Sequence, residues 1–277
     1  MEHSVTIDGA KTAYWEYNAE KATTLIFVHG FRGTHHGLLK IAEQLPEYHL
    51  IIPDLPGFGA SEPLHVEHSV ANYTAWLHAF RQQVSGGQNN IVGHSFGSIV
   101  ASHYAAKHSD AVEKLILINP IGAPALQGDQ RFLTQLAILY YWLARKLPAS
   151  AARAWISFKP TTKVMSIAMR KTKDKSIRRY IDEQHYAYFS TFANPTQLAE
   201  AFRTSVSHDV SHVAEKLRIP TLLIAGEKDQ ITSLAKQHEL HGRISGAKLE
   251  VIPNVGHLTH YETPEAVARD IRAFIGG

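Results

Sequence analysis

The stretch NIVGHSFGSIVASHYAA, residues 90–106, joins an apolar run to a segment with helical spacing through the pentapeptide GHSFG. Gly-x-Ser-x-Gly between a strand and a helix is typical of a nucleophile elbow, a turn so tight that side chains at the glycine positions would clash. Such a turn lifts the hydroxyl of Ser95 above the carboxyl end of a sheet. The alternative is that Ser95 only fills a turn, because so short a pattern also arises by chance. Partners elsewhere in the chain decide between these interpretations.

Strand and helix patterns alternate on both sides of this turn. Two short segments joined by Asp8-Gly9 are typical of a hairpin. Continuous apolar runs that indicate buried parallel strands follow, with segments of helical spacing between them: TTLIFVHG (23–30), YHLIIPDL (48–55), NNIVGH (89–94), VEKLILINP (112–120), IPTLLIAGEKD (219–229) and AKLEVIPNVGH (247–257). This alternation predicts an α/β fold, with a mostly parallel sheet and helices on both faces.

The alternation is interrupted between residues 123 and 206, where only helix-like segments occur. We therefore expect a core formed by residues 1–122 and 207–277, with an all-helical insertion at 123–206. The insertion has thirteen Lys and Arg against five Asp and Glu, whereas the rest of the chain is acidic on balance. The charge thus separates along the same boundary as the secondary structure.

A serine hydroxyl needs a base to remove its proton, and the base needs a carboxylate that fixes its tautomer. His257 follows a predicted strand and would lie at the carboxyl edge of the sheet, whereas His260 is expected to be structural or part of a pocket wall. Asp229 also follows an apolar strand, and its rival Glu227 is interpreted as a solvated turn residue. The order Ser95, Asp229, His257 is the Ser…Asp…His order of one fold class.

A tetrahedral intermediate also needs donors for its oxyanion. The backbone N–H of Phe96, at the start of the predicted helix, is well placed to be one donor. The loop after LIFVHG supplies the N–H of Phe31 as the natural second candidate. We interpret His29 as a residue that orients this loop or packs beneath it, not as a second base.

The motifs FVHGF, PDLPGFGAS, VGHSFG, LLIAGEKDQI and VGHLTHYETPE, in this order and spacing, resemble the α/β-hydrolase superfamily. The resemblance covers residues 4–122 and 207–277. It implies an eight-stranded, mostly parallel sheet with a helical cap inserted after the sixth strand, where the helical insertion lies. Members of this kind are mostly carboxylesterases, lipases, monoacylglycerol lipases, thioesterases and carbon–carbon bond hydrolases.

On this resemblance Ser95, Asp229 and His257 fall on the family's triad, and Phe31 and Phe96 on its oxyanion donors. Haloalkane dehalogenases and epoxide hydrolases of this fold have an aspartate as nucleophile, so Ser95 argues against both. Many relatives have a tryptophan after the oxyanion loop, where this chain has THHGLL. One of its histidines, His35 or His36, could therefore face the pocket mouth, and a surface position for both is the alternative.

Composition narrows the class further. The chain of 277 residues has no cysteine, which rules out disulfides and thiolate metal sites and fits a reducing compartment. Its first residues lack the pattern of a signal peptide, and no uncharged apolar run reaches the roughly 18 residues needed to span a bilayer. We expect a cytoplasmic protein without a metal ion or organic cofactor. The net charge of +3 is too small to indicate a nucleic-acid partner.

Two segments of the insertion suggest what reaches the site. FLTQLAILYYWL, residues 132–143, is apolar on nearly every side, so a helix there either packs among its neighbours or roofs an acyl pocket and touches lipid. RKTKDKSIRR, residues 170–179, has six basic residues and one acid. It is either a solvated edge or a surface that attracts anionic headgroups or an anionic substrate. A weak contact between the basic cap and a membrane surface is therefore one expectation, and the oligomeric state stays open.

These patterns together predict a serine hydrolase that cleaves a carboxylic ester of a moderately hydrophobic acyl group, through an acyl-enzyme and with a small acyl compound as its partner. A carbon–carbon bond hydrolase or lyase with the same triad is the alternative within chemistry. A non-catalytic small-molecule receptor is the alternative outside it.

Overall fold

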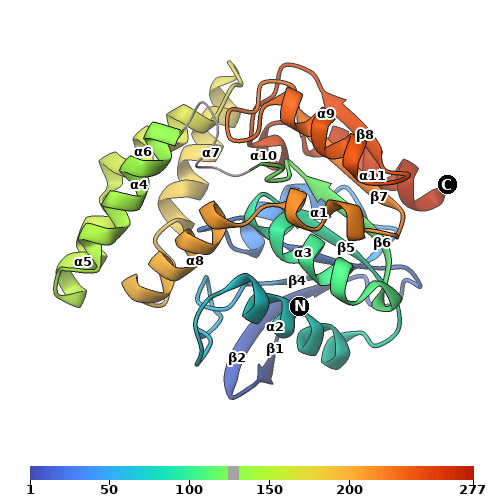
Figure 1. The fold of residues 1–277 in the computed structure, drawn as a ribbon, viewed down its shortest axis with the longest axis horizontal. Coiled ribbons are helices and arrows are strands. Elements are labelled where there is room, and N and C mark those ends of the chain that lie inside the picture. The colour runs from blue at the N-terminus through green and yellow to red at the C-terminus, as the bar shows by residue number, and fades with distance from the viewer. Residues whose placement is uncertain (124–130) are drawn as a thin grey trace.

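The computed structural model describes residues 1–123 and 131–277, and a single sheet lies at its centre (Figure 1). The strands are β1 Glu2–Ile7, β2 Ala10–Tyr17, β3 Thr24–Val28, β4 His49–Pro53, β5 Asn89–His94, β6 Val112–Ile118, β7 Thr221–Gly226 and β8 Lys248–Ile252. Their order is β1-β2-β4-β3-β5-β6-β7-β8. The hairpin β1–β2 and the pair β2–β4 are antiparallel, and all other pairs are parallel. The predicted fold class is confirmed.

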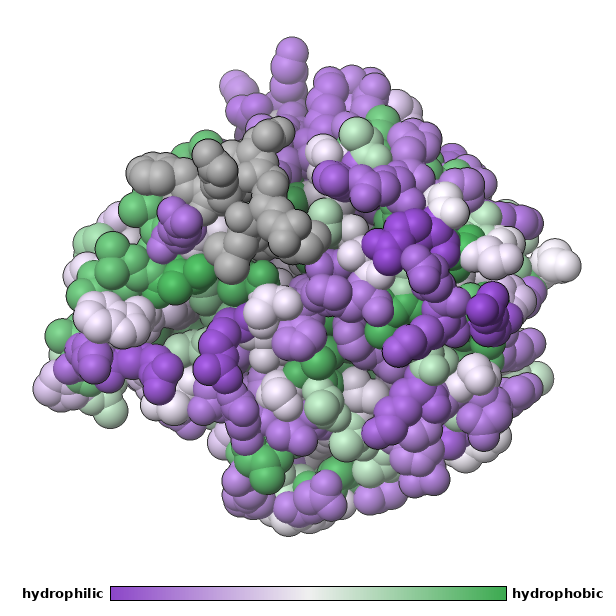
Figure 2. Space-filling view, viewed as in Figure 1, coloured by the Kyte–Doolittle hydropathy of each residue, from purple (hydrophilic) through white to green (hydrophobic). Residues whose placement is uncertain are grey.

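Among the described residues between β6 and β7, five helices form what we call the cap: α4 Arg131–Ala144, α5 Ala149–Ile156, α6 Lys159–Met169, α7 Lys175–Tyr188 and α8 Pro195–Ser207. Two of these helices start with a side-chain cap: Asp174 caps α7 and Asn194 caps α8. Figure 1 shows these helices beside the sheet, not on either of its faces. Apolar side chains gather on the outside of this part of the molecule (Figure 2).

Most of the remaining helices cover the two faces of the sheet. These helices outside the cap are α1 Leu39–Ala42, α2 Val70–Val84, α3 Phe96–Lys107, α9 Leu234–Arg243, α10 Thr259–Glu262 and α11 Pro264–Gly276, with 3₁₀ turns at His35–Leu38, Ser109–Ala111, Val210–His212 and Ala214–Lys216. Of these, α10 packs against α1, α7 and α11. The 3₁₀ turn His35–Leu38 leads directly into the short α1.

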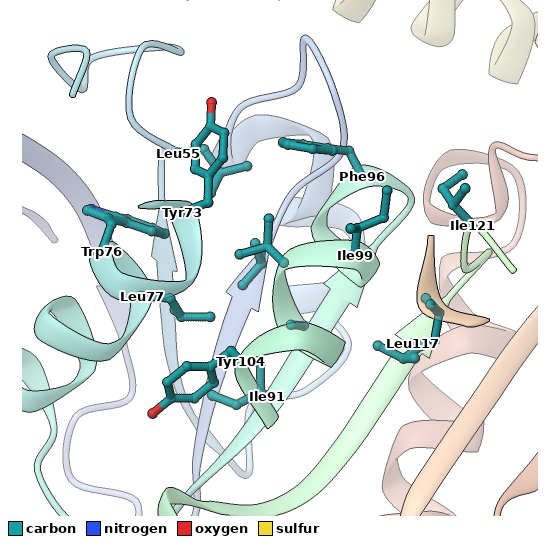
Figure 3. Packing of buried hydrophobic residues seen from close by; sticks show 14 of the residues in the cluster. Leu55, Tyr73, Trp76, Leu77, Ile91, Phe96, Ile99, Tyr104, Leu117 and Ile121 are labelled. Atoms are coloured by element: carbon teal, nitrogen blue, oxygen red, sulfur yellow. The ribbon is translucent and has the colours of Figure 1, made fainter. Parts of the chain in front are cut away.

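Successive residues of the central strands point to opposite faces, as strand geometry requires. On β3, Ile26 and Val28 pack under α2 and α3, whereas Leu25 and Phe27 pack against α1 and α11. Figure 3 shows the first of these clusters, in which Tyr73 and Trp76 of α2 face Ile99 of α3. Each fully buried side chain of this kind stabilises the fold by about 1.5–3 kcal/mol. The rigid sheet that results is the platform for the residues at its carboxyl edge.

Arg32 joins the cap to the loop after β3. Its side chain is buried, and its Nε donates to the carbonyl of Phe189 at 2.8 Å while an Nη donates to the carbonyl of Ile156 at 3.2 Å. A second Nη reaches the hydroxyl of Tyr141 at 3.4 Å. One guanidinium therefore contacts α4, the end of α5 and the residue after α7, directly beside Phe31.

The cap leaves and re-enters the core at adjacent points. The N–H of Val210, just after α8, donates to the carbonyl of Ile121, just after β6, at 2.8 Å. The strands on either side of the insertion, β6 and β7, are neighbours in the sheet, with Ile118 paired to Ile224. The two ends of the insertion therefore lie next to each other and are joined by this hydrogen bond.

Candidate active site

Ser95 lies at the turn between β5 and α3 with φ 52° and ψ −118°, a conformation that is strained for a residue with a side chain. The flanking glycines permit the turn. A Cβ on Gly97 would lie 2.0 Å from the carbonyl oxygen of Val28, and one on Gly93 would lie 2.5 Å from that of Gly97. The backbone therefore crosses β3 so closely that only hydrogen fits at these positions, and the serine is presented at the carboxyl edge of the sheet.

The three residues predicted to act together lie within hydrogen-bond distance of one another. The Oγ of Ser95 is 2.8 Å from Nε2 of His257, and Nδ1 of His257 is 2.8 Å from Oδ2 of Asp229. The carboxylate can only accept, so Nδ1 donates to it and Nε2 is left to accept from the hydroxyl. This is the arrangement that general-base activation of a serine requires.

Asp229 is buried and is held by several donors. The backbone N–H groups of Ile231 and Thr232 donate to its Oδ1, at 2.7 and 3.3 Å. Burial raises the pKa of this carboxyl, but the neighbouring His257 and the hydrogen bonds outweigh that effect and hold the pKa below its ordinary value. The carboxylate is thus kept ionised opposite the imidazole.

Asn119 is a residue of the site that the sequence reasoning missed. It directly follows β6 with φ 45°, and its Nδ2 donates to Oδ2 of Asp229 at 2.9 Å. The hydroxyl of Thr259 donates to Oδ1 of Asn119, which fixes the orientation of the amide. The signal was available, because Asn119 is a polar residue at the carboxyl end of the strand between those that carry Ser95 and Asp229.

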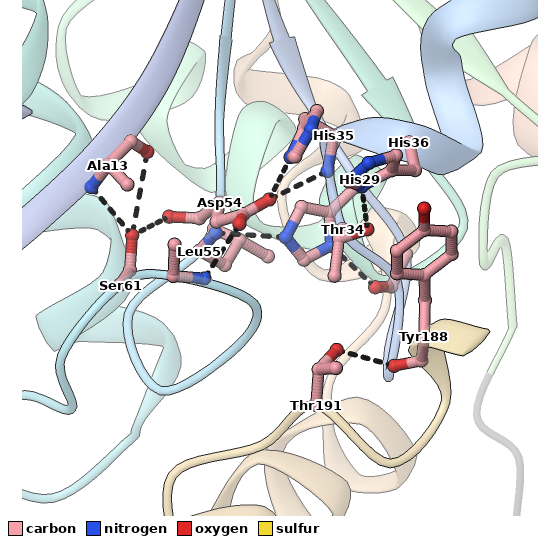
Figure 4. A network of polar contacts seen from close by, with 12 residues as sticks. Ala13, His29, Thr34, His35, His36, Asp54, Leu55, Ser61, Tyr188 and Thr191 are labelled. Atoms are coloured by element: carbon pink, nitrogen blue, oxygen red, sulfur yellow. Dashed lines mark hydrogen bonds and ion pairs between the residues drawn. The ribbon is translucent and has the colours of Figure 1, made fainter. Parts of the chain in front are cut away.

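The backbone N–H groups of Phe31 and Phe96 have no acceptor among the described residues. Both are therefore available to donate to a bound molecule. Their rings pack edge to face with centroids 6.4 Å apart. His29 fixes the loop of Phe31, since its Nδ1 donates to the carbonyl of Gly30 at 2.8 Å and its Nε2 accepts from the N–H of Leu55 at 2.8 Å. Burial lowers the pKa of His29, so it holds the loop as a neutral imidazole. Figure 4 shows this network.

The rival residues lie elsewhere. Glu227 is exposed and accepts from the backbone N–H of Asn254 at 2.7 Å. His260 is buried with its ring centroid 4.0 Å from that of His94, and it makes no hydrogen bond within the described residues to Ser95 or Asp229. Burial lowers the pKa of His94 to about 3 and that of His260 well below its ordinary value. Both imidazoles therefore stay neutral behind His257.

The two histidines after the oxyanion loop point away from the cavity. His35 is buried and its Nδ1 lies 3.0 Å from Oδ1 of Asp54, as Figure 4 shows. His36 stacks on Tyr188 with centroids 3.9 Å apart. His35 thus contacts the core and His36 contacts the cap, and neither residue lines the cavity.

A cavity of about 380 Å³ lies above Ser95, between the sheet edge and the cap. The cap contributes mainly apolar residues to its lining: Ala137, Met165, Ala168, Met169, Phe189, Phe202 and Val206. The core contributes Phe31, Phe96 and Leu258 around Ser95 and His257. The cavity can therefore hold an apolar group with its reacting carbon next to the serine hydroxyl.

Within the described ranges, no three His, Cys, Asp or Glu side chains are grouped as ligands of a metal ion. Over the same residues, no helix is both long and apolar enough to cross a membrane.

The sheet order, the elbow and the inserted cap define an α/β hydrolase. A family model for the alpha/beta hydrolase fold matches residues 23–264, which is most of the chain, so the chain belongs to this family. Lipase 3 of Moraxella sp. (strain TA144) is 27% identical, over 97% of this chain and 82% of its own length. A monoacylglycerol lipase of Xenopus laevis is 26% identical, over 91% of this chain and 75% of its own length.

A solved structure described as a membrane phospholipase A, a bacterial virulence factor, superposes with a TM-score of 0.80 at 26% identity, covering 100% of this chain and 86% of its own. The resemblance predicted from the motifs is confirmed. With lipases and other hydrolases as its relatives, the chain is a hydrolase.

Proposed function

We propose that the protein hydrolyses carboxylic esters of moderately hydrophobic acyl groups, with Ser95 as nucleophile, His257 as base and Asp229 as the carboxylate that orients it. One observation carries the proposal. Ser95, His257 and Asp229 are joined by hydrogen bonds, and Ser95 and His257 line an apolar cavity of about 380 Å³.

In this mechanism, His257 accepts the proton of Ser95 as the hydroxyl attacks the ester carbonyl. The N–H groups of Phe31 and Phe96 hold the oxyanion, and each such donor stabilises the transition state by about 3–4 kcal/mol. His257 then gives the proton to the leaving alcohol, and a water attacks the acyl-enzyme with the same groups in the same roles. Asn119 and the backbone around Asp229 keep the carboxylate in place throughout.

The lining of the cavity supports the substrate class. Its walls on the cap side are side chains such as Met165, Phe189 and Phe202, which match an acyl chain and offer few partners to a polar acyl group. A volume of about 380 Å³ is near the lower end of the range of small-molecule sites, roughly 300–1,000 Å³, which favours a chain of moderate length. Relatives named lipase and monoacylglycerol lipase support the choice of a lipid-like ester.

A fluorophosphonate probe and a panel of nitrophenyl esters of increasing chain length test the proposal. We expect the probe to modify Ser95, and Ser95→Ala to abolish labelling and lower kcat by about 10⁴-fold or more. Ser109→Ala, at an exposed position, serves as the matched control and should behave as the unchanged protein.

The other outcomes separate the alternatives. An unlabelled Ser95 would show that the serine is not activated and would favour a small-molecule receptor. Labelling of Ser95 with near-zero rates on every ester would point instead to cleavage of a carbon–carbon bond.

A further inference from the structure

The outer surface of the cap is rich in exposed apolar side chains. Of the fifteen large apolar side chains exposed among the described residues, eleven lie between residues 136 and 186. On α4, four of them are 41–51% exposed, and their spacing of three and four residues places them along one side of the helix: Leu136, Leu139, Trp142 and Leu143. This helix therefore has an apolar side that its own fold leaves uncovered.

The inward side of α4 is occupied differently. Tyr141 and Ala144 are buried, and Ala137 lines the cavity above Ser95. The sequence of this helix left open whether it packs among neighbours, roofs the pocket or faces lipid. In the structure one side both packs on its neighbours and lines the cavity, and the other side is exposed.

The next two helices repeat the arrangement. On α6, Val164 and Ile167 are 67% and 51% exposed, whereas Met165 lines the cavity. Trp155 of α5 and Phe158, just before α6, are 45% and 58% exposed. We call the exposed apolar side chains of these three helices the outer cap face: Leu136, Leu139, Trp142, Leu143, Trp155, Phe158, Val164 and Ile167. Figure 2 shows hydrophobic residues gathered over the cap on the left of the view.

The cavity reaches the surface next to the outer cap face. Ala168 lines the cavity and is exposed, and it follows Ile167 of the outer cap face directly. Ile231, from the loop of Asp229, also lines the cavity and is 52% exposed. The apolar lining of the cavity therefore continues to the surface at Ala168 and Ile231.

Basic side chains without ion pairs follow α6 along the chain. Asp182 of α7 forms ion pairs with Lys163 and Arg170 and so ties α6 to α7. From residue 171 to residue 179, five further cations have no carboxylate partner within the described residues: Lys171, Lys173, Lys175, Arg178 and Arg179. At the far end of α4, Lys146 lies over the ring of Trp142 at 5.4 Å.

We propose that the outer cap face docks on the surface of an anionic lipid bilayer, with the apolar side chains in the interface and the cations of α7 against the headgroups. Apolar and tryptophan side chains next to unpaired Lys and Arg are the combination that such a surface attracts. A second copy of this chain is a poorer partner, because pairing the face with itself brings the same cations together. The docking does not depend on the proposed ester hydrolysis, but the two together would let substrate enter from the lipid side.

Sedimentation with vesicles tests the proposal. We expect the protein to bind vesicles of phosphatidylcholine and phosphatidylglycerol, to bind phosphatidylcholine alone much more weakly, and to be released by high salt. Charge reversal in Lys173→Glu, Lys175→Glu and Arg179→Glu together should weaken binding about a hundredfold or more. Reversal of unpaired cations on the core, Lys107→Glu with Lys216→Glu, is the control and should leave most of the binding in place.

The apolar contribution is tested by Leu139→Ser with Trp142→Ser, compared with Val66→Ser and Val251→Ser on the core. The first pair should weaken vesicle binding about tenfold or more, and the second should not. All of these surface variants should keep the turnover of a soluble short-chain ester, which shows that they are folded. Ser95→Ala should bind vesicles normally, so a failure of docking and a failure of the proposed chemistry give different results.

The proposal is overturned if the unchanged protein stays in the supernatant with anionic vesicles, or if the outer cap face variants bind as well as the core controls. A dimer in analytical ultracentrifugation that Leu139→Ser with Trp142→Ser dissociates, without any vesicle binding, would identify a second copy as the occupant instead.

Discussion

The core and the cap of this molecule differ in where they place their polar and apolar side chains. In the core, polar groups such as Asp229 and Asn119 are buried and bonded to one another, and large apolar groups are almost all covered. In the cap, apolar groups such as Trp142 and Val164 are left in the open, and the cations of α7 are unpaired. The difference teaches that, under the proposed function, the chemistry depends on the sheet edge and access to it depends on the cap.

The largest effect is expected where the core's polar chain is broken. Asp229→Asn keeps the shape but removes the acceptor that sets the tautomer of His257, so kcat should fall by about 10⁴-fold with little change in KM. Glu227→Gln, two residues away and exposed, is the matched control. Equal losses in the two variants, measured with a nitrophenyl ester, would refute the assignment of the carboxylate.

The next effect concerns the junction between the two regions. Arg32→Met removes the charged hydrogen bonds to Phe189 and Ile156, which should lower the free energy of unfolding by about 3 kcal/mol. We expect hydrogen exchange to accelerate in α4, α5 and α7 and to stay slow in β5 and β6. Arg145→Met, an exposed cation just after α4, should change neither. Uniform acceleration in sheet and cap alike would mean that the two regions open as one unit.

A smaller effect is expected at the opening of the cavity. Ala168→Trp should narrow the opening and lower kcat/KM for longer-chain esters by roughly tenfold to a hundredfold, because a pocket discriminates by about 1–3 kcal/mol per misfit group. Acetate esters should be turned over as before. Val164→Trp, on the same helix but outside the cavity lining, is the control, and a similar loss there would show a general disturbance of α6.

The smallest effect is one of pH on stability. Burial lowers the pKa of His185 in the cap to about 4 and of His94 in the core to about 3, both from about 6.5 in the unfolded chain. Between these values and 6.5 only the unfolded state takes up the proton, so the free energy of unfolding falls as the pH falls below about 6.5. Each such histidine contributes at most about 1.4 kcal/mol per pH unit.

Urea unfolding at a series of pH values between neutral and acid measures this slope. His185→Gln should reduce it, whereas His238→Gln, at an exposed position, should not. If the unchanged protein and both variants show the same slope, folding does not lower the pKa of His185.

The core was largely predictable because its signals are local. An apolar run followed by a polar residue marks the carboxyl end of a strand, and this located Ser95, Asp229 and His257 from their own neighbourhoods. Asn119 escaped because its role depends on Asp229, 110 residues away. Arg32 escaped for the same reason, since its partners Ile156 and Phe189 are brought to it only by the folded cap.

Histidines and cap helices show the limit of pattern reasoning. Several of the eighteen histidines are buried, among them His94, His185 and His260. The periodicity of α4 could not separate its inward side from its exposed side, because both are apolar. Only the packing of α4 against α5 and α8 makes the distinction.

The single hydrogen bond between Ile121 and Val210 has a consequence for how such a molecule can diversify. An insertion whose two ends meet is topologically a side branch, and its exchange for another helical branch would leave the pairing of β1 to β8 in place, although the isolated bridge between Phe58 and Phe192 would be lost. Substrate preference can then change by recombination of one segment, while the residues around Ser95 are inherited as a unit. For an engineer, the two ends of that hydrogen bond are the natural points at which to graft a different cap.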